Sequence, residues 1–251
     1  MFIETRGASL FTAAFGPGPR TILAHGGWVG SGELWLPVFE EMSRRWRTVT
    51  YDHRGTGATL VQGAITFEDM VADVFAVLDA LGIGRCVLAA ESAGAAVVLE
   101  AALRAPERFE GLVLVAPRHD TRPDAQTDAL VAGCRADFAA TMAVFVDACL
   151  PDGSHAQAQW GRQIVGRSTA DAAVGLLSAM VGVTASERAG ELKLPVLVLH
   201  GARDGIVPAN SSEALAARIR GARLVVHPSA GHVPTVTEPA WVAGEIAARF
   251  G

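Results

Sequence analysis

Ser92 lies where an apolar, strand-like run passes through small residues into an apolar helical run. The stretch reads Cys86-Val-Leu-Ala-Ala-Glu-Ser92-Ala-Gly94-Ala-Ala-Val-Val. A serine held in a tight strand-turn-helix elbow needs small residues two positions before and after it, because the neighbouring backbones must pass closely. Ala90 and Gly94 meet this need, although the common pattern G-x-S-x-G has glycine at both positions. The chemistry of such a serine is nucleophilic attack on a carbonyl carbon.

A serine hydroxyl needs a general base, and that base needs a group that fixes its tautomer and stabilises its cation. Asp204 follows the apolar run that ends at His200, and His232 follows Gly231 in the loop before the last helical segment. Loops at the carboxyl edge of a parallel sheet are where ligands bind. The sequence therefore predicts a catalytic triad in the order Ser92, Asp204, His232.

Two other residues compete for these roles. Asp120 follows the apolar run that ends at Val115, and it could supply the acid in place of Asp204. His227 is expected to belong to the end of its strand rather than to a functional loop.

An oxyanion needs hydrogen-bond donors. The backbone N–H of Ala93 lies at the start of a predicted helix, where unsatisfied donors and the helix dipole favour negative charge. We expect a second donor from the loop His25-Gly26-Gly27-Trp28, because glycine lets the backbone approach a substrate closely. Gly27 is the first choice for this donor and Trp28 the second, with the Trp28 side chain then forming a pocket wall.

Strand-like and helical segments alternate along the chain, which predicts an α/β fold with a doubly wound, mostly parallel sheet. Short, nearly unbroken apolar runs are typical of strands that are buried on both faces; they cover residues 21–24, 47–51, 85–90, 111–115, 194–199 and 222–226. Helical spacing covers residues 36–46, 67–81, 95–104, 212–219 and 241–250. Thr66 to Asp69 resembles a capping box at the start of the second of these helices.

The alternation stops between residues 118 and 193, where only helical periodicity is found. We interpret residues 118–193 as an inserted helical cap, and residues 1–117 and 194–251 as the core. The predicted pocket lining is apolar and consists of Trp28, Phe138, Met142, Phe145 and Trp160, with Leu176 and Met180. The cap segment shows no cluster of Arg or Lys that could bind a carboxylate or phosphate. A largely neutral small-molecule substrate is therefore expected.

Composition excludes several classes of function. Half of the 251 residues are hydrophobic, 19% are charged and the net charge is −5, which argues against disorder and against a nucleic-acid partner. No apolar run is long enough for a membrane span and no signal peptide is evident, so we expect a cytoplasmic protein. The three scattered cysteines, Cys86, Cys134 and Cys149, are expected to be reduced core thiols rather than a metal site. Composition does not predict an oligomeric state.

The chain resembles the α/β-hydrolase superfamily nearly from end to end. The matching landmarks are His25-Gly26-Gly27, Asp52-His53-Arg54-Gly55-Thr56-Gly57, Ala90-Glu91-Ser92-Ala93-Gly94, His200-Gly201-Ala202-Arg203-Asp204 and Gly231-His232. The resemblance implies a Ser/Asp/His triad without metal or organic cofactor. It also implies that residues 52–57 form a structural turn, so that His53 is not the base, and that Glu91 packs beneath the elbow.

A serine nucleophile separates the chain from relatives that use a carboxylate or a cysteine, and it favours hydrolysis of a small to medium ester or lactone. A carbon–carbon bond hydrolase or a perhydrolase with the same triad is an alternative, as is a hydrolase-fold signalling protein that binds a ligand with little turnover. Aminopeptidase relatives usually continue His-Gly-Gly with Pro-Gly, whereas Trp28 and Val29 follow here.

Overall fold

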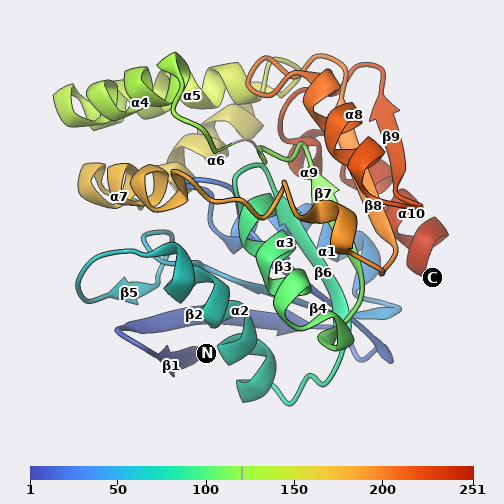
Figure 1. Cartoon of the computed structure of the whole chain (residues 1–251). Helices are drawn as coiled ribbons and strands as arrows, with labels where there is room; N and C mark the ends of the chain where they lie inside the picture. The colour runs from blue at the N-terminus through green and yellow to red at the C-terminus, as the bar shows by residue number, and fades with distance from the viewer. Residues whose placement is uncertain (120) are drawn as a thin grey trace.

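The computed structural model describes residues 1–119 and 121–251, and within them nine strands form one sheet (Figure 1). Its order is β1-β2-β4-β3-β6-β7-β8-β9, with β5 paired to β2. The strands from β4 to β9 along this order pair in parallel, whereas β1, β2 and β5 pair antiparallel at one end. The strands are β1 (Phe2–Thr5), β2 (Ala8–Phe15), β3 (Arg20–His25), β4 (Trp46–Tyr51), β5 (Leu60–Val61), β6 (Cys86–Glu91), β7 (Phe109–Val115), β8 (Val196–Gly201) and β9 (Arg223–His227).

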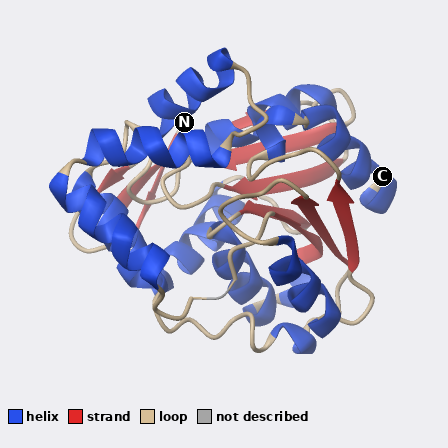
Figure 2. Ribbon diagram, turned by 90° about the horizontal axis from the view of Figure 1, so that it is seen from above, coloured by secondary structure: helices blue, strands red, loops and turns tan. Residues whose placement is uncertain are grey.

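Helices cover both faces of the sheet (Figure 2). Successive strand residues point to opposite faces, and in β3 Ile22 packs with α1 (Leu36–Met42) and α10 (Pro239–Phe250), whereas Leu23 packs with α2 (Phe67–Ala80) and α3 (Gly94–Arg104). The remaining core helices are α8 (Ala209–Arg218), α9 (Pro234–Thr237) and the 3-10 turns Gly32–Trp35, Pro106–Arg108 and Ala189–Glu191. Among the described residues, no helix has the length and apolar character needed to cross a membrane.

This architecture confirms the predicted doubly wound fold. The six predicted strands correspond to β3, β4, β6, β7, β8 and β9. The Thr66 hydroxyl accepts a hydrogen bond from the Asp69 N–H at the start of α2, as the capping pattern predicts. The sequence missed β1, β2 and β5, because β2 alternates buried and half-buried residues at the edge of the sheet instead of forming an unbroken apolar run.

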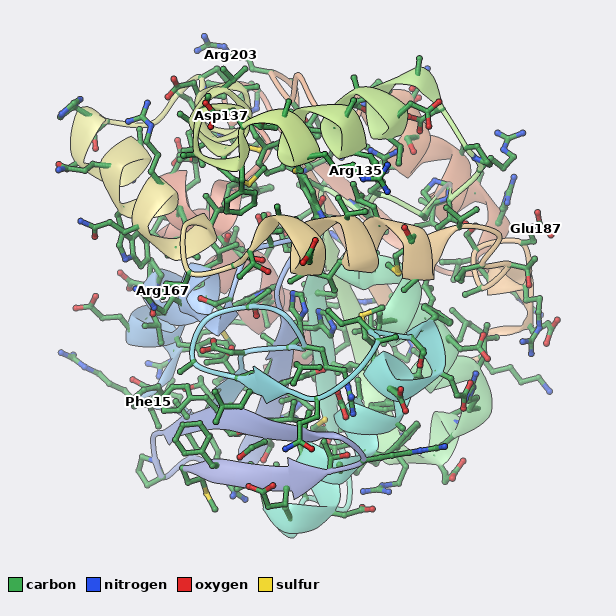
Figure 3. All side chains as sticks on the ribbon, turned by 90° about the vertical axis from the view of Figure 1, so that its left-hand side faces the viewer. Phe15, Arg135, Asp137, Arg167, Glu187 and Arg203 are labelled. Carbon is green, nitrogen blue, oxygen red and sulfur yellow. The ribbon has the colours of Figure 1, made fainter. Side chains whose placement is uncertain are left out.

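Four helices lie within the predicted cap segment, α4 (Ala125–Ala136), α5 (Phe138–Cys149), α6 (His155–Val165) and α7 (Ala170–Met180). They sit above one end of the sheet in Figure 1, and in Figure 3 Arg135 and Asp137 lie far from Phe15 of β2. Several side-chain contacts connect this layer to the core, and two of them lie near the loop after β3. Arg167, between α6 and α7, forms an ion pair with Glu33, and the Trp28 indole N–H donates to the Ala173 carbonyl at 2.8 Å.

A buried ion pair anchors the turn that follows β4. Both side chains of Arg54 and Asp73 are 1% exposed, and Arg54 donates from Nε at 2.7 Å and from a terminal nitrogen at 3.0 Å to the two carboxylate oxygens. Arg54 also donates to the Arg6 carbonyl, and Thr5 donates to Asp73. The pair therefore joins the turn to α2 and to the N-terminal hairpin.

We predict that Asp73→Asn lowers the free energy of unfolding by about 3–5 kcal/mol, because it leaves a buried guanidinium without a counter-ion. Glu191→Gln is the control, since it weakens the exposed pair with Arg188 and should cost about 1 kcal/mol or less. Urea denaturation of both variants measures the difference. Equal losses would contradict a structural role for the buried pair.

Candidate active site

Ser92 occupies a strained elbow between β6 and α3. Its φ is +49°, a left-handed conformation that is uncommon for a residue other than glycine. The Ser92 N–H donates to the Val115 carbonyl at 2.9 Å. A side chain at Gly94 would place its Cβ 2.3 Å from the Gly26 oxygen and 3.4 Å from the Ala90 Cβ. The small residues at 90 and 94 therefore let the elbow form against the loop after β3.

The structure brings the three predicted triad residues together. The Ser92 hydroxyl lies 2.9 Å from His232 Nε2, and His232 Nδ1 lies 2.7 Å from Asp204 Oδ2. A carboxylate can only accept, so Nδ1 carries the hydrogen and Nε2 is free to accept the hydroxyl proton. Ser92 is 9% exposed and His232 2% exposed, so the base is shielded from bulk water.

His232 and two backbone amides hold Asp204 in its ionised form. Its Oδ1 accepts the N–H groups of Ile206 at 2.8 Å and Val207 at 2.9 Å. Burial acts to raise the pKa of Asp204, but the hydrogen bond and charge of His232 and these two amides outweigh it and hold the pKa below its ordinary value. A carboxylate that stays charged keeps His232 in the tautomer that can act as base.

His200 contacts the same carboxylate, and no role was predicted for it. Its Nε2 lies 3.3 Å from Asp204 Oδ2 and 2.9 Å from the Val207 carbonyl, and its Nδ1 lies 2.8 Å from the Ser212 hydroxyl. Its position at the end of β8, four residues before the loop aspartate, was the signal that could have identified it.

The predicted oxyanion donors lie beside the elbow. In the described part of the chain, the N–H groups of Gly27, Trp28 and Ala93 donate to no protein acceptor. A Cβ at Gly27 would lie 3.4 Å from the Ser92 Cβ, so this backbone passes directly over the serine. Free donors next to a buried hydroxyl are the arrangement that an oxyanion requires.

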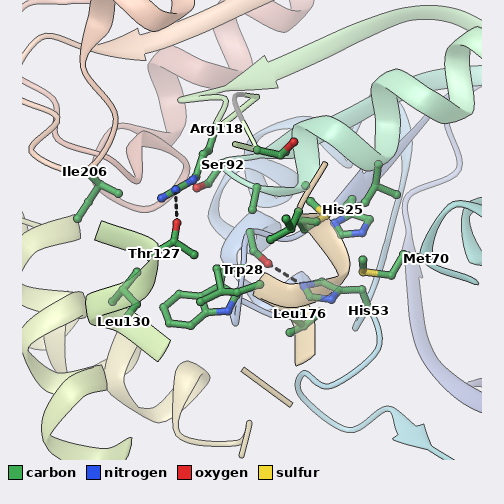
Figure 4. Close-up of a pocket in the computed structure, with 18 of the residues that line it drawn as sticks. His25, Trp28, His53, Met70, Ser92, Arg118, Thr127, Leu130, Leu176 and Ile206 are labelled. Atoms are coloured by element: carbon green, nitrogen blue, oxygen red, sulfur yellow. Dashed lines mark hydrogen bonds between the residues drawn. The ribbon is translucent and has the colours of Figure 1, made fainter. Parts of the chain in front are cut away.

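Two hollows meet at Ser92. Both are lined by Gly27, Trp28, Ser92 and Phe145, and the Trp28 and Phe145 rings pack edge to face with centroids 5.1 Å apart. The first hollow, shown in Figure 4, extends beneath α4 and α7 and includes Met70, Val97, Leu130, Leu176, Leu177 and Met180. The second extends beneath α5 and α6 and includes Glu91, Cys149, Gln157, Trp160, His232 and Val236.

Most of the residues predicted to line the pocket do so in the structure, and two do not. Trp28, Phe145, Trp160, Leu176 and Met180 line one or both hollows. The remaining two predicted residues, Phe138 and Met142, line neither. Met142 is 3% exposed within the core and Phe138 packs against that core, because the N-terminal part of α5 lies against α4 and only its C-terminal part reaches Ser92.

The structure corrects the expectation that no arginines gather in the cap. Arg118 and Arg122, which follow β7, both line the first hollow. Arg118 is labelled in Figure 4. Arg118 donates to the Asp124 carboxylate at 2.6 Å and to the Thr127 hydroxyl at 2.7 Å. The charge of Arg118 is therefore balanced within the protein.

The other residues that the sequence weighed lie as follows. Asp120 is outside the described residues. His227 accepts the Ala230 N–H and packs against Trp241, 4.9 Å between ring centroids, at the end of β9. All three cysteines are free and buried, and burial raises the pKa of the Cys149 thiol well above its usual range. Among the described residues, no group of three or more His, Cys, Asp or Glu side chains could hold a metal ion.

Glu91 lies directly before Ser92 and is 1% exposed. The Thr235 hydroxyl donates to it at 3.2 Å. Burial, with the nearby charge of Asp204, raises the pKa of Glu91 to about 8 against the opposing effect of Thr235. Glu91 is therefore largely protonated at neutral pH.

Comparisons with known proteins agree with this geometry. A family model described as "Serine aminopeptidase, S33" matches residues 20–239. A protein of Caulobacter segnis named "Putative carbamate hydrolase RutD" is 30% identical over 236 residues and covers 88% of each chain. A "Pimeloyl-[acyl-carrier protein] methyl ester esterase" of Nitrosomonas europaea is 30% identical over 247 residues, 92% of this chain and 96% of its own. A solved hydrolase from Pseudomonas aeruginosa superposes with a TM-score of 0.89 at 28% identity, over 100% of this chain and 98% of the other.

We predict that Glu91→Gln becomes more stable than the wild type as pH rises from about 5 to about 8. The folded state holds the Glu91 proton up to about pH 8, whereas the unfolded state releases it near its ordinary pKa of 4.5, so wild-type stability falls across this window. Each unit of pKa difference corresponds to about 1.4 kcal/mol. Urea denaturation across the pH range measures the effect.

Glu41→Gln is the matched control, because Glu41 is exposed on α1. Its stability relative to the wild type should change little with pH. If the Glu91→Gln curve runs parallel to the wild-type curve, Glu91 is ionised in the folded protein and the assignment fails.

Proposed function

The chain belongs to the α/β-hydrolase superfamily, in the serine aminopeptidase family, and from this premise we propose that it hydrolyses small to medium, largely neutral carboxylic esters or lactones through an acyl-enzyme. One observation carries the proposal. A serine on a strained elbow, a histidine and an ionised aspartate form a continuous hydrogen-bonded series at the floor of two apolar hollows.

In the proposed reaction, the Ser92 oxygen attacks the substrate carbonyl carbon while His232 Nε2 takes the hydroxyl proton. The carbonyl π electrons move to oxygen, and the N–H groups of Ala93 and Gly27 hold the resulting anion. The carbon–oxygen bond to the leaving alkoxide then breaks, and His232 returns the proton to it. Water, deprotonated by the same histidine, attacks the acyl-enzyme and releases the acid and Ser92.

Asp204 orients the imidazole and stabilises its cation in both steps. Each well-placed oxyanion donor contributes roughly 3–4 kcal/mol to lowering the barrier. This stabilisation is greater for the anion than for the carbonyl, so it accelerates the reaction rather than merely tightening substrate binding.

Relatives support an ester or a closely related carbonyl as substrate. One 30% identical protein is named a methyl ester esterase. The name of the Caulobacter relatives favours a carbamate as the second candidate, since a carbamate presents an ester carbonyl that also bears nitrogen. The same attack by Ser92 serves both. A panel of p-nitrophenyl esters, a lactone, an aryl carbamate and an aminoacyl anilide separates these substrates from peptides.

The lining of the two hollows indicates where the two parts of an ester would bind. His232 lines the second hollow and is absent from the first. The leaving oxygen must receive its proton from His232, so we assign the leaving alcohol to the second hollow and the acyl group to the first. The Trp28 and Phe145 rings then stand between the two halves of the substrate.

We predict that an organophosphonate ester labels Ser92 in the wild type and does not label Ser92→Ala. The same substitution should lower the rate of ester hydrolysis by about 10⁶-fold, because the nucleophile is lost while the fold remains. Mass spectrometry of the labelled peptide and a p-nitrophenyl ester assay measure the two effects.

Cys149→Ala is the control for labelling, because this thiol lines the second hollow. The label should still be found on Ser92. Label on a cysteine, or a folded wild type that neither reacts nor turns over an ester, would rule out the proposed hydrolase and favour a ligand-binding role.

We predict opposite changes in selectivity for two cap variants. Trp160→Ala enlarges the second hollow and should favour longer alcohols in a series with a fixed acyl group, by up to roughly fourfold in kcat/KM per added methylene. Met180→Ala enlarges the first hollow and should favour longer acyl groups in a methyl ester series. The two variants are controls for each other. If Trp160→Ala changes the selectivity only in the acyl series, the acyl group and the leaving alcohol have been assigned to the wrong hollows.

A further inference from the structure

His53 is a buried histidine that the proposed reaction does not use. It lies in the turn after β4, between Asp52 and Arg54, and it is 2% exposed. Its ring forms part of the wall of the first hollow (Figure 4). His53 Nε2 lies 2.7 Å from the Gly27 carbonyl oxygen, so the turn contacts the same glycine that supplies the predicted oxyanion donor.

The direction of this hydrogen bond follows from its partners. A carbonyl oxygen can only accept, and both ring nitrogens of His53 face one: Nε2 lies 2.7 Å from the Gly27 oxygen and Nδ1 lies 3.2 Å from the Arg54 oxygen. Burial lowers the pKa of His53, so the ring is neutral and carries a single N–H. We place this hydrogen on Nε2, because its contact is the shorter one. The ring is also held in place by His25, which stacks on it with centroids 4.6 Å apart and an angle of 16° between the planes.

The hydrogen bond from His53 fixes a peptide plane in the loop that contains Gly26 and Gly27. Glycine accepts many backbone conformations, so two consecutive glycines make the peptide planes of the loop easy to turn. The loop is anchored before Gly27, where the Trp35 indole donates to the His25 carbonyl at 3.1 Å, and after it, where Asp52 accepts the Gly32 N–H at 3.0 Å. In the described part of the chain, His53 is the donor that holds the Gly27 carbonyl between these anchors.

A fixed carbonyl fixes the N–H group of the same peptide plane. The Gly27 carbonyl shares a planar trans peptide with the Trp28 N–H, so the two groups point in opposite directions. With this plane set and the His25 ring holding the Gly26 carbonyl at 2.7 Å, the Gly27 N–H is set as well. Both residues that the sequence proposed as the second oxyanion donor are therefore oriented through bonds from the stacked histidines.

We propose that His53 is a positioning residue of the oxyanion hole, which sets the backbone donors of the Gly27 loop before substrate arrives. This inference rests on the proposed function of Ser92. Because the donors act on the anion that forms during the reaction, loss of the bond from His53 should lower kcat far more than it raises KM.

A matched pair of substitutions tests the bond. Gln and Met have nearly the same length and shape, but Gln offers an N–H near the position of Nε2 and Met does not. We expect His53→Met to lower kcat for a p-nitrophenyl ester by about tenfold to hundredfold, with KM changed by less than about threefold. His53→Gln should recover most of the lost kcat.

Inhibitor affinity provides a second test of the hydrogen bond from His53 to Gly27. A trifluoromethyl ketone adds the Ser92 oxygen to its carbonyl carbon, places an anion on the carbonyl oxygen and passes the proton to His232. Its affinity should fall in His53→Met by the same factor as kcat/KM. The affinity of an uncleavable ether analogue, which forms no anion, should not change.

Three results would overturn the proposal. They are an unchanged kcat in folded His53→Met, equal losses in His53→Met and His53→Gln, and a change confined to KM. If His53→Met does not fold, nitrogen-15 NMR of the wild type decides, because the proposal requires the His53 hydrogen on Nε2. A hydrogen on Nδ1 would refute it. A wild type that turns over no ester would instead overturn the proposed function, and the NMR assignment would still stand or fall by itself.

Discussion

The left-handed turn at Ser92 is the constraint on which the rest of the site depends. A serine with φ of +49° is kept there because the residues around it are small enough for three backbones to converge. The Gly26 oxygen would clash with any side chain at Gly94, and Ala90 leaves the space that the turn needs. The elbow thus brings the hydroxyl, the start of α3 and the Gly27 loop into one small volume, where a reacting carbonyl meets all of them.

The parallel sheet supplies the remaining groups at little conformational cost. Strands β3, β6 and β8 run in the same direction, so the loops that carry Gly27, Ser92 and Asp204 emerge at one edge. The loop after β9 brings His232 to this edge. Amides of Ile206 and Val207 keep the aspartate charged. The chemistry is therefore assembled from short loops on rigid strands, while the cap supplies the walls.

Much of this arrangement could be predicted from the chain, because strong local signals mark it. Small residues around Ser92 and unbroken apolar strands identified the elbow, the fold and the order of the acid and the base.

The pocket was harder to predict. Helical periodicity shows which stripe of α5 is buried but not how far along it the site extends. Both Phe138 and Phe145 were therefore predicted to line the pocket, and only Phe145 does so. Arg118 and Arg122 were missed because they lie in the loop before the cap helices. The part played by His53 depends on a contact across 26 residues of sequence, which no local pattern encodes.

The indole of Trp28 is shared between the two layers of the molecule. It belongs to the loop that crosses Ser92, yet its N–H donates to the Ala173 carbonyl in α7 of the cap. If α7 swings outward to admit a substrate, this hydrogen bond must break, and the residue next to Gly27 loses its tether. Any outward movement of α7 would therefore act directly on the backbone beside Ser92.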